Sequence, residues 1–179
     1  MRLIGVLLFA ALFSSEVAAN LFMKSDMEKR IHNNDDHQCP QLEKRLCPEG
    51  VVYLGRCFTF VSQKMDWKSA EAHCQNLAPG SHLASIHCKE QFDIMISIIP
   101  KVKEKHITTW IGLNDIKTEG IHVWIDDSPT DFTKWYSGEP NNGGNEDCVQ
   151  IADKKTIGWN DESCRLKYPF ICSQKLSCS

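Results

Sequence analysis

The sequence lacks the motifs and the composition of several large functional classes. It has no H-E-x-x-H, no G-x-S-x-G and no glycine-rich phosphate loop, so nothing in it indicates an enzyme of these kinds. Its 23 acidic residues outnumber its 20 basic ones, and the net charge of -3 gives no support for nucleic-acid binding. No N-x-[ST] site occurs, so N-linked sugar is not expected on the chain. We therefore expect a binding protein without catalytic activity.

Apolar runs long enough to cross a membrane are also missing. The run LIGVLLFAALF at residues 3–13 is well short of the roughly 20 residues that a spanning helix needs. It follows Arg2 and precedes small residues at Val17 and Ala19, which is the pattern of a secretory signal peptide over residues 1–19. The pattern predicts a secreted, extracellular protein without a membrane anchor.

Cysteine, by contrast, is abundant. Nine cysteines in a secreted chain indicate disulfides rather than zinc ligands. Because nine is an odd number, at least one thiol is either free or bonded to a second chain, which would give a disulfide-linked homo-oligomer. The nine are Cys39, Cys47, Cys57, Cys74, Cys88, Cys148, Cys164, Cys172 and Cys178.

The distribution of polar residues separates a polar segment from one domain. Residues 20–46 are charged with few core-sized side chains, and we interpret them as an exposed tail or linker. A histidine and aspartate cluster there could in principle hold a metal, but we favour a solvated tail. The domain is expected at residues 47–174, with a short tail at 175–179. The cluster consists of His32, Asp35, Asp36 and His37.

The first half of the domain predicts a hairpin and two helices. β-branched and aromatic residues around Gly55 predict a β-hairpin closed by a Cys47–Cys57 pair. Asp66 can cap a first helix, and Pro100 marks the end of a second. The apolar face of the first helix comprises Trp67, Ala70, Cys74 and Leu77, and that of the second comprises Phe92, Met95, Ile96 and Ile99.

The second half of the domain consists of short β-type runs separated by turns and polar loops. Two helices followed by strands and long loops predict an α+β domain. The runs are residues 108–113, 122–127, 147–152, 157–161 and 168–173.

Residues 139–148, EPNNGGNEDC, gather acidic and amide side chains with no basic residue among them. Calcium prefers six to eight oxygen ligands of these kinds. Asn160 and Asp161 form a second such group, which a Cys148–Cys164 disulfide would tie to the first. Turns favour Gly, Asn and Asp for backbone reasons alone, but two clusters, each near a cysteine, favour a cation site. The side chains expected around one ion are Glu139, Asn141, Glu146, Asn160 and Asp161.

Five side chains from loops leave coordination positions open. Two neighbouring sugar hydroxyls would suit these positions. Each hydroxyl can give a lone pair to the ion, donate its proton to a carboxylate and accept a bond from an asparagine amide. The alternation of Glu and Asn therefore indicates a template for a vicinal diol.

Several motifs, in this order, resemble those of the C-type lectin domain. The motifs are WIGL at 110–113, EPN at 139–141, Glu-Asp-Cys at 146–148, WND at 159–161 and the closing Cys172. The resemblance implies an α+β fold with two helices, short antiparallel strands, long calcium-binding loops and three core disulfides. The implied disulfides are Cys74–Cys172 and Cys148–Cys164, beside the Cys47–Cys57 pair, which is similar to that of long-form members.

The resemblance also implies the cofactor, Ca²⁺, and a cis peptide bond between Glu139 and Pro140. Carried over position by position, the five side chains named above are the principal calcium ligands and also the carbohydrate-binding residues. An auxiliary calcium site is matched as well, although two of its acids, Asp115 and Glu119, are equally explained as solvated loop residues. The auxiliary ligands are Asp115, Glu119, Asn142 and Asp147.

The Glu-Pro-Asn order at 139–141 is similar to that of members that bind mannose, whereas Gln-Pro-Asp accompanies galactose binding. We therefore expect a secreted calcium-dependent lectin for mannose-type glycans on cell or microbial surfaces, with a role in innate immunity. The alternative on the same fold is an ice-binding antifreeze protein or a venom-type protein-binding module.

Two features depart from the family pattern. Asp127 stands where the family usually has glycine, which is expected to alter a turn without touching the site. Cys39, Cys88 and Cys178 lie outside the common pairs. If Cys39 bonds to Cys178, Cys88 is the odd thiol, and an intermolecular disulfide at Cys88 or at Cys39 is our preferred use.

Overall fold

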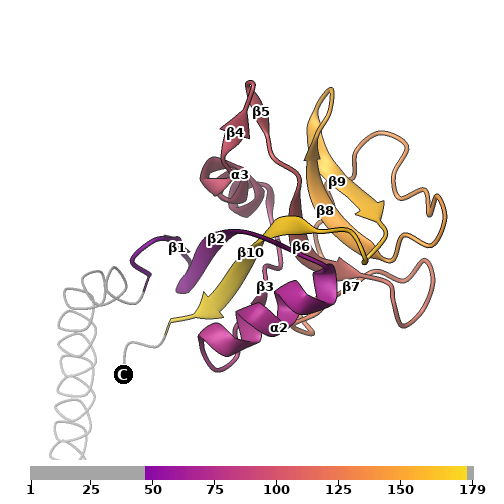
Figure 1. The fold of residues 1–179 in the computed structure, drawn as a ribbon. Coiled ribbons are helices and arrows are strands. Elements are labelled where there is room, and N and C mark those ends of the chain that lie inside the picture. The colour runs from indigo at the N-terminus through magenta and orange to yellow at the C-terminus, as the bar shows by residue number, and fades with distance from the viewer. Residues whose placement is uncertain (1–46, 177–179) are drawn as a thin grey trace, which may run out of the picture. The chain divides into compact units, whose positions relative to one another are not determined.

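A computed structural model describes residues 47–176 of the chain (Figure 1). The predicted signal peptide, the polar segment at 20–46 with its histidine and aspartate cluster, Cys39 and Cys178 lie outside the described residues. Neither helix of the described part is long and apolar enough to cross a membrane.

Eight strands form one sheet with the order β1-β2-β10-β6-β8-β9, to which β3 adds beside β10 and β7 beside β6. All pairs are antiparallel except β10 with β6. The strands are β1 (Val51–Tyr53), β2 (Arg56–Met65), β3 (His82–Leu83), β6 (Thr109–Asn114), β7 (Val123–Trp124), β8 (Cys148–Asp153), β9 (Ile157–Glu162) and β10 (Tyr168–Lys175). The expected α+β fold is therefore confirmed.

A separate two-stranded hairpin joins β4 (Lys101–Val102) to β5 (Lys105–His106). Neither this hairpin nor β3 was predicted from the sequence. Strands of two residues are too short to show an alternating pattern, and charged lysines begin both β4 and β5.

The first helix, α2 (Trp67–Leu77), begins where the sequence predicted. Asp66 caps it, since its carboxylate accepts a hydrogen bond from the Ser69 amide at 3.0 Å. The indole of Trp67 donates to the Ile111 carbonyl at 2.8 Å and so ties the helix start to β6. Leu77, which we expected on the buried face, is 49% exposed, because it lies in the last turn, beyond the Cys74 disulfide that holds the helix to β10.

The second helix, α3 (Lys89–Ile98), buries Phe92 and Met95 against the sheet as predicted. Ile99 is also buried, but it follows the helix as its cap, and Ile96 is only partly buried. The sulfur of Cys88 caps the N-terminus by accepting from the Gln91 amide at 3.4 Å.

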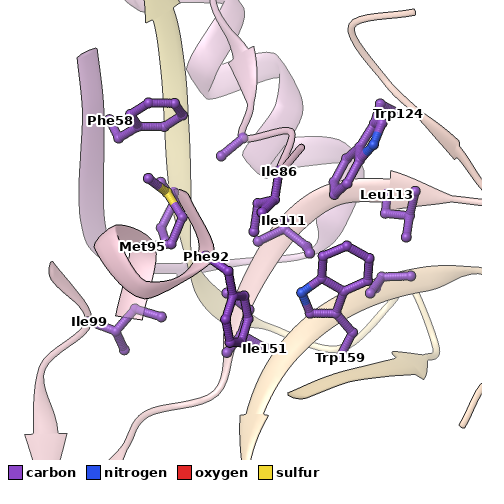
Figure 2. Packing of buried hydrophobic residues seen from close by; sticks show 13 residues of the cluster. Phe58, Ile86, Phe92, Met95, Ile99, Ile111, Leu113, Trp124, Ile151 and Trp159 are labelled. Atoms are coloured by element: carbon purple, nitrogen blue, oxygen red, sulfur yellow. The ribbon is translucent and has the colours of Figure 1, made fainter. Parts of the chain in front are cut away.

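The main core lies between α3 and the sheet, and Figure 2 shows Phe92 and Met95 on the helix side facing Ile111 and Ile151. At its other end, Trp124 and Trp159 meet edge to face with 5.5 Å between ring centroids. Trp159 thus joins the core to the strand that carries the WND motif.

Three disulfides link the described cysteines, and all three pairs are those expected: Cys47–Cys57, Cys74–Cys172 and Cys148–Cys164. Within residues 47–176, Cys88 is the only cysteine outside a disulfide. Cys148–Cys164 joins the start of β8 to the turn after β9, so it ties the end of the 139–148 segment to the segment that follows Asp161.

The turn after β7 contains Asp127, which has a φ of 59°, in the left-handed region that favours glycine. Its amide donates to the Trp124 carbonyl at 3.1 Å and closes the turn, and its side chain is exposed. The turn therefore keeps the backbone shape expected of glycine although an aspartate occupies it.

We predict that Asp127→Gly raises the free energy of unfolding by about 0.5 to 1 kcal/mol, because glycine adopts this φ without steric strain. Asp127→Ala, which also removes the charge, is expected to lower it. Urea unfolding at pH 7 measures both. Equal shifts in the two variants would assign the effect to the charge instead of the backbone.

Candidate functional site

The strand β9 positions the candidate site by holding the loop that precedes Glu139. The amide of Trp159 donates to the Lys134 carbonyl at 2.7 Å, and the amide of Tyr136 donates to the Trp159 carbonyl at 2.8 Å. A Cβ on Gly158 would lie only 2.9 Å from the Tyr136 nitrogen, so only glycine permits this approach. The loop thus reaches Glu139 already fixed against β9.

Asp161, at the end of the WND motif, is the buried centre of the site. Its side chain is 1% exposed, and both carboxylate oxygens accept the Asn141 amide at 3.1 Å. One of them also accepts the Asn142 amide at 2.7 Å. The peptide bond between Glu139 and Pro140 is cis, as the family resemblance implied. Asp161 therefore binds the backbone of the Glu-Pro-Asn segment directly.

The side chains of Glu139 and Asp161 lie side by side. Burial raises the pKa of Glu139, and the neighbouring Asp161 carboxylate raises it further, whereas Lys154 and Asn141 lower it in part. The Asn141 amide donates to the Glu139 carboxylate. Two acids held together in this way would both be stabilised by a cation between them.

Glu146 and Asn141 converge on the same side of the loop around Gly143. The Glu146 carboxylate accepts the Gly143 amide at 2.8 Å. A Cβ on Gly143 would lie 2.7 Å from the Asn141 Oδ1 atom and 3.1 Å from the Glu146 Oε2 atom. The absence of a side chain at Gly143 therefore leaves room in which both oxygens can approach one ligand.

Asn160 completes the set from β9 and brings in a residue that sequence reasoning missed. Its Oδ1 atom accepts a hydrogen bond from the Lys154 ammonium at 2.6 Å, and its amide nitrogen donates to the Asp161 carbonyl. The same ammonium lies 3.8 Å from Glu139 Oε1 and 5.3 Å from the centre of the Tyr136 ring. Lys154 follows β8, outside both acidic motifs, so no sequence pattern pointed to it.

The four residues of the expected auxiliary site are only partly brought together. Asp115 is 3% exposed, and one of its oxygens accepts the Gly120 amide at 2.8 Å, while the other is buried without a partner in the described residues. The Asp115 amide donates to the Asp147 carbonyl at 3.1 Å. Asn142 accepts the Glu146 amide at 3.0 Å.

The two acids that could equally be solvated loop residues, Asp115 and Glu119, differ in burial. Asp115 is not a solvated loop acid, whereas Glu119 is exposed and contacts no described polar group. His122, absent from the expected set, has its Nε2 atom 3.9 Å from Asp115 Oδ2 and packs on Trp135 at 4.8 Å.

The donor set of the main site is suited to a hard cation. Within residues 47–176, no three His, Cys, Asp or Glu side chains are grouped closely enough to form a metal site alone. The expected ligands instead combine three carboxylates with two amide oxygens, and calcium accepts such mixed oxygen donors. The residues present therefore fit calcium chemistry and offer no imidazole or thiolate to a softer metal.

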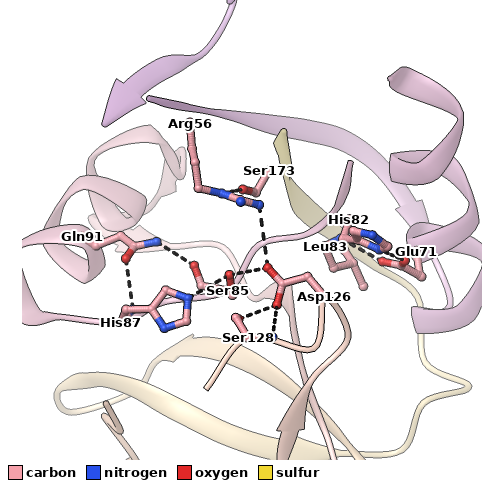
Figure 3. A network of polar contacts seen from close by, with 10 residues as sticks. All are labelled: Arg56, Glu71, His82, Leu83, Ser85, His87, Gln91, Asp126, Ser128 and Ser173. Carbon is pink, nitrogen blue, oxygen red and sulfur yellow. Dashed lines mark hydrogen bonds and ion pairs between the residues drawn. The ribbon is translucent and has the colours of Figure 1, made fainter. Parts of the chain in front are cut away.

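A second polar cluster resembles a catalytic triad in its distances. His87 lies 3.2 Å from the Ser85 hydroxyl through Nε2 and 2.9 Å from Asp131 through Nδ1. Ser85, however, is 2% exposed and donates its hydroxyl hydrogen to Asp126 at 2.7 Å, as Figure 3 shows. Arg56 adds an ion pair to Asp126 at 3.7 Å. The cluster therefore joins buried segments and presents no accessible nucleophile.

Comparison with known proteins decides the family. Residues 63–174 match the model of the Lectin C-type domain, which is more than half of the chain. The chain belongs to the C-type lectin domain family. Members of this family generally bind calcium and generally lack enzymatic activity.

Three relatives illustrate the range of the family. A lectin from Pleurodeles waltl is 37% identical over 150 residues, 83% of this chain and 87% of that protein. A mannose-binding C-type lectin isoform from Oxyuranus scutellatus is 38% identical over 129 residues, 70% of this chain and 82% of that protein. The galactose-specific lectin nattectin from Thalassophryne nattereri is 36% identical over 131 residues, 73% and 81% respectively.

Two solved structures share the fold of this C-type lectin domain. The cow carbohydrate-recognition domain of CD23, crystallised in the presence of a GlcNAc2Man3 oligosaccharide, matches with a TM-score of 0.64 and 30% identity, over 73% of this chain and 95% of that chain. A calcium-independent type II antifreeze protein matches with a TM-score of 0.63 and 30% identity, over 71% and 92%. The fold thus occurs in proteins with different ligands.

The raised pKa of Glu139 leads to a prediction about stability in a chelator. Ionisation of this carboxyl beside Asp161 destabilises the fold above its raised pKa, and protonation at lower pH removes the repulsion. Glu139→Gln should therefore stabilise the protein at pH 7 by about 0.5 kcal/mol, a value kept small because Lys154 and Asn141 already offset part of the repulsion. The gain should vanish below about pH 4, near the usual pKa of glutamate.

Urea unfolding in EGTA at both pH values measures this difference. Glu162→Gln is the matched control, because it removes the same charge from the residue next to Asp161 on β9. A Glu139→Gln variant less stable than the wild type at pH 7 would contradict the repulsion.

Proposed function

We propose that this protein is a calcium-dependent lectin that binds mannose-type glycans. The observation that carries the proposal is the pairing of Glu139 with Asp161, two carboxylates from distant segments held side by side. Asn141 and Asn160 supply amide groups beside them. A divalent ion would neutralise this pair and be reached by all four side chains.

The roles of the chain's residues follow from their donors and acceptors. Calcium, when bound, would supply open coordination positions to two adjacent sugar hydroxyls. The carboxylates of Glu139 and Glu146 would accept hydroxyl protons, and the amides of Asn141 and Asn160 would donate to the hydroxyl oxygens. Asp161 would hold the loop in place, since its carboxylate already accepts the Asn141 and Asn142 amides.

The order Glu139, Pro140, Asn141 supports mannose-type over galactose-type ligands. It places an acceptor and then a donor around the ion, an order that suits two equatorial hydroxyls such as the 3- and 4-hydroxyls of mannose. Galactose has an axial 4-hydroxyl and would fit poorly. One relative is named mannose-binding and another galactose-specific. Overall similarity therefore does not predict which sugar this chain binds, and the proposal relies on the residues of the loop.

A second calcium ion is part of the proposal. The buried Oδ1 atom of Asp115 has no hydrogen-bond partner among the described residues, and a bound cation would supply one. The Asp115 amide donates to the Asp147 carbonyl, whereas the Asn142 side chain contacts the Glu146 amide; Asn142 would have to leave this amide and Glu119 would have to turn inward to join Asp115 at the ion. This ion would order the loop that bears Glu146 without touching sugar.

The proposed biological setting is recognition of microbial or cell-surface sugars by a secreted protein in innate defence. A single shallow sugar site typically binds with a Kd of about 1 mM, or roughly -4 kcal/mol. Linking several sites can strengthen binding by about 10² to 10⁴. The unpaired thiol of Cys88, which is partly buried, is the described group that could join two chains.

The alternative function, ice or protein binding on the same fold, is favoured by one observation, the similarity to an antifreeze protein. That protein is calcium-independent, whereas this chain keeps all five expected oxygen ligands, three in the 139–148 segment and two on β9. A thermal-hysteresis measurement separates the two functions, and we expect no hysteresis above that of a control protein at equal concentration. Hysteresis above that of the control, whether in calcium or in EGTA, would favour the alternative.

We predict that the protein binds immobilised mannan in calcium and is released by EGTA. Asp161→Asn should abolish retention, because it removes charge from the ion and weakens the hold on the Asn141 amide. Glu162→Gln, on the adjacent residue of β9, should bind as the wild type does, because successive side chains of a strand point to opposite faces. Retention of the wild type in excess EGTA would contradict the proposal.

The double change Glu139→Gln with Asn141→Asp should shift preference from mannose towards galactose, because it exchanges the donor and acceptor around the ion. A glycan array with and without calcium measures the ratio of the two signals. An unchanged ratio, with calcium still bound, would show that this pair does not set specificity.

A further inference from the structure

The ammonium of Lys154 has three partners, and they come from different segments of the chain. It donates to the Asn160 side-chain oxygen at 2.6 Å and lies 3.8 Å from a Glu139 carboxylate oxygen. It also lies over the Tyr136 ring, 5.3 Å from its centre, where a cation is favoured. A carboxylate, an amide oxygen and an aromatic face together surround one positive charge.

The position of Lys154 is set by the hairpin that carries it. The strands β8 and β9 pair in register up to Asp153 and Ile157, and the Lys154 amide donates to the Thr156 carbonyl at 3.3 Å. The backbone of Lys154 is therefore fixed a short distance from Asn160. Its side chain is 51% exposed, so the ammonium can leave its partners for water without disturbing the core.

Two of the three partners are also ligands of the proposed calcium site. Calcium binds oxygen at about 2.3 to 2.6 Å. With the ammonium 2.6 Å from the same Asn160 oxygen, the two cations would lie at most about 5 Å apart. At that distance like charges repel strongly in a partly buried site. Simultaneous binding of calcium and of the Lys154 ammonium to the Asn160 oxygen is therefore unfavourable.

We propose that Lys154 is a tethered cation that competes with calcium for Glu139 and Asn160, so that calcium binding must displace its ammonium. The inference rests on the proposed calcium site. Lys154 then sets the calcium concentration at which the site fills. Because sugar binding requires bound calcium, it depends on the same concentration. Without calcium, the ammonium supplies part of the charge that the two acids require.

If Lys154 served only to stabilise the fold, its removal would change the free energy of unfolding and not the calcium affinity. An ion pair that is half exposed contributes little to folding stability, so removal of Lys154 should hardly change unfolding. Lys155 offers a matched control, because it is the next residue, is exposed and makes no polar contact with the described site. Its replacement changes the net charge equally and leaves the contacts at Asn160 intact.

The test is isothermal titration of calcium into the full-length protein, the Lys154→Met variant and the Lys155→Met variant at one ionic strength. We expect Lys154→Met to bind calcium about threefold to tenfold more tightly and Lys155→Met to change by less than about twofold.

Equal affinities in all three proteins, or equal gains in both variants, would overturn the competition and leave the proposed function standing. A wild type that binds no calcium while Lys154→Met does would support competition in its strongest form. Absence of binding in all three would overturn both proposals.

A second measurement follows the ammonium itself. Lysines of the wild type are acetylated briefly with and without calcium, and the modified fractions at Lys154 and Lys155 are compared by mass spectrometry. Displacement predicts a severalfold rise at Lys154 in calcium, with little change at Lys155. If calcium binds and Lys154 reacts at an unchanged rate, the ammonium is not displaced and the inference is wrong.

Discussion

The structure of the candidate site depends on the contact between one buried carboxylate and the backbone of a loop. Asp161 is nearly inaccessible and accepts the amides of Asn141 and Asn142. It sits on β9, two residues after Trp159, whose ring packs against Trp124 in the core. A rigid core element thus holds a loop that has little apolar surface of its own. Binding sites are often built in this way, with functional loops fixed on a stable scaffold.

The same contact creates an electrostatic problem. Once Asp161 holds the loop, Glu139 lies beside it, and burial together with the neighbouring charge raises the pKa of Glu139. The close approach of the two carboxylates suits a cation, but their repulsion destabilises the fold when no positive charge lies beside them. The ammonium of Lys154 partly offsets this repulsion. Stability and ligand binding consequently place opposite demands on the same side chains, as is common at functional sites.

The C-type lectin fold does not by itself determine the ligand. Structures of a carbohydrate-recognition domain and of a calcium-independent antifreeze protein match this chain about equally well. What distinguishes such proteins are the side chains on the loops, since function resides in sites and not in folds. Here the loop retains carboxylate and amide oxygens, and that chemistry is the ground for the carbohydrate hypothesis.

The sequence by itself determined the elements with long periodic patterns, such as the helix from Trp67, and the oxygen-rich character of the loop at Glu139. The residues also suggested the Cys47–Cys57 pair and the grouping of that loop with Asp161, whereas the resemblance to C-type lectins added the Cys74–Cys172 and Cys148–Cys164 pairs. Only the tertiary structure decided that Asp115 is buried, that Leu77 is exposed, and that Lys154 reaches Asn160. The reason is physical: burial and charge pairing depend on which residues distant in the chain come into contact, and local patterns carry no record of those contacts.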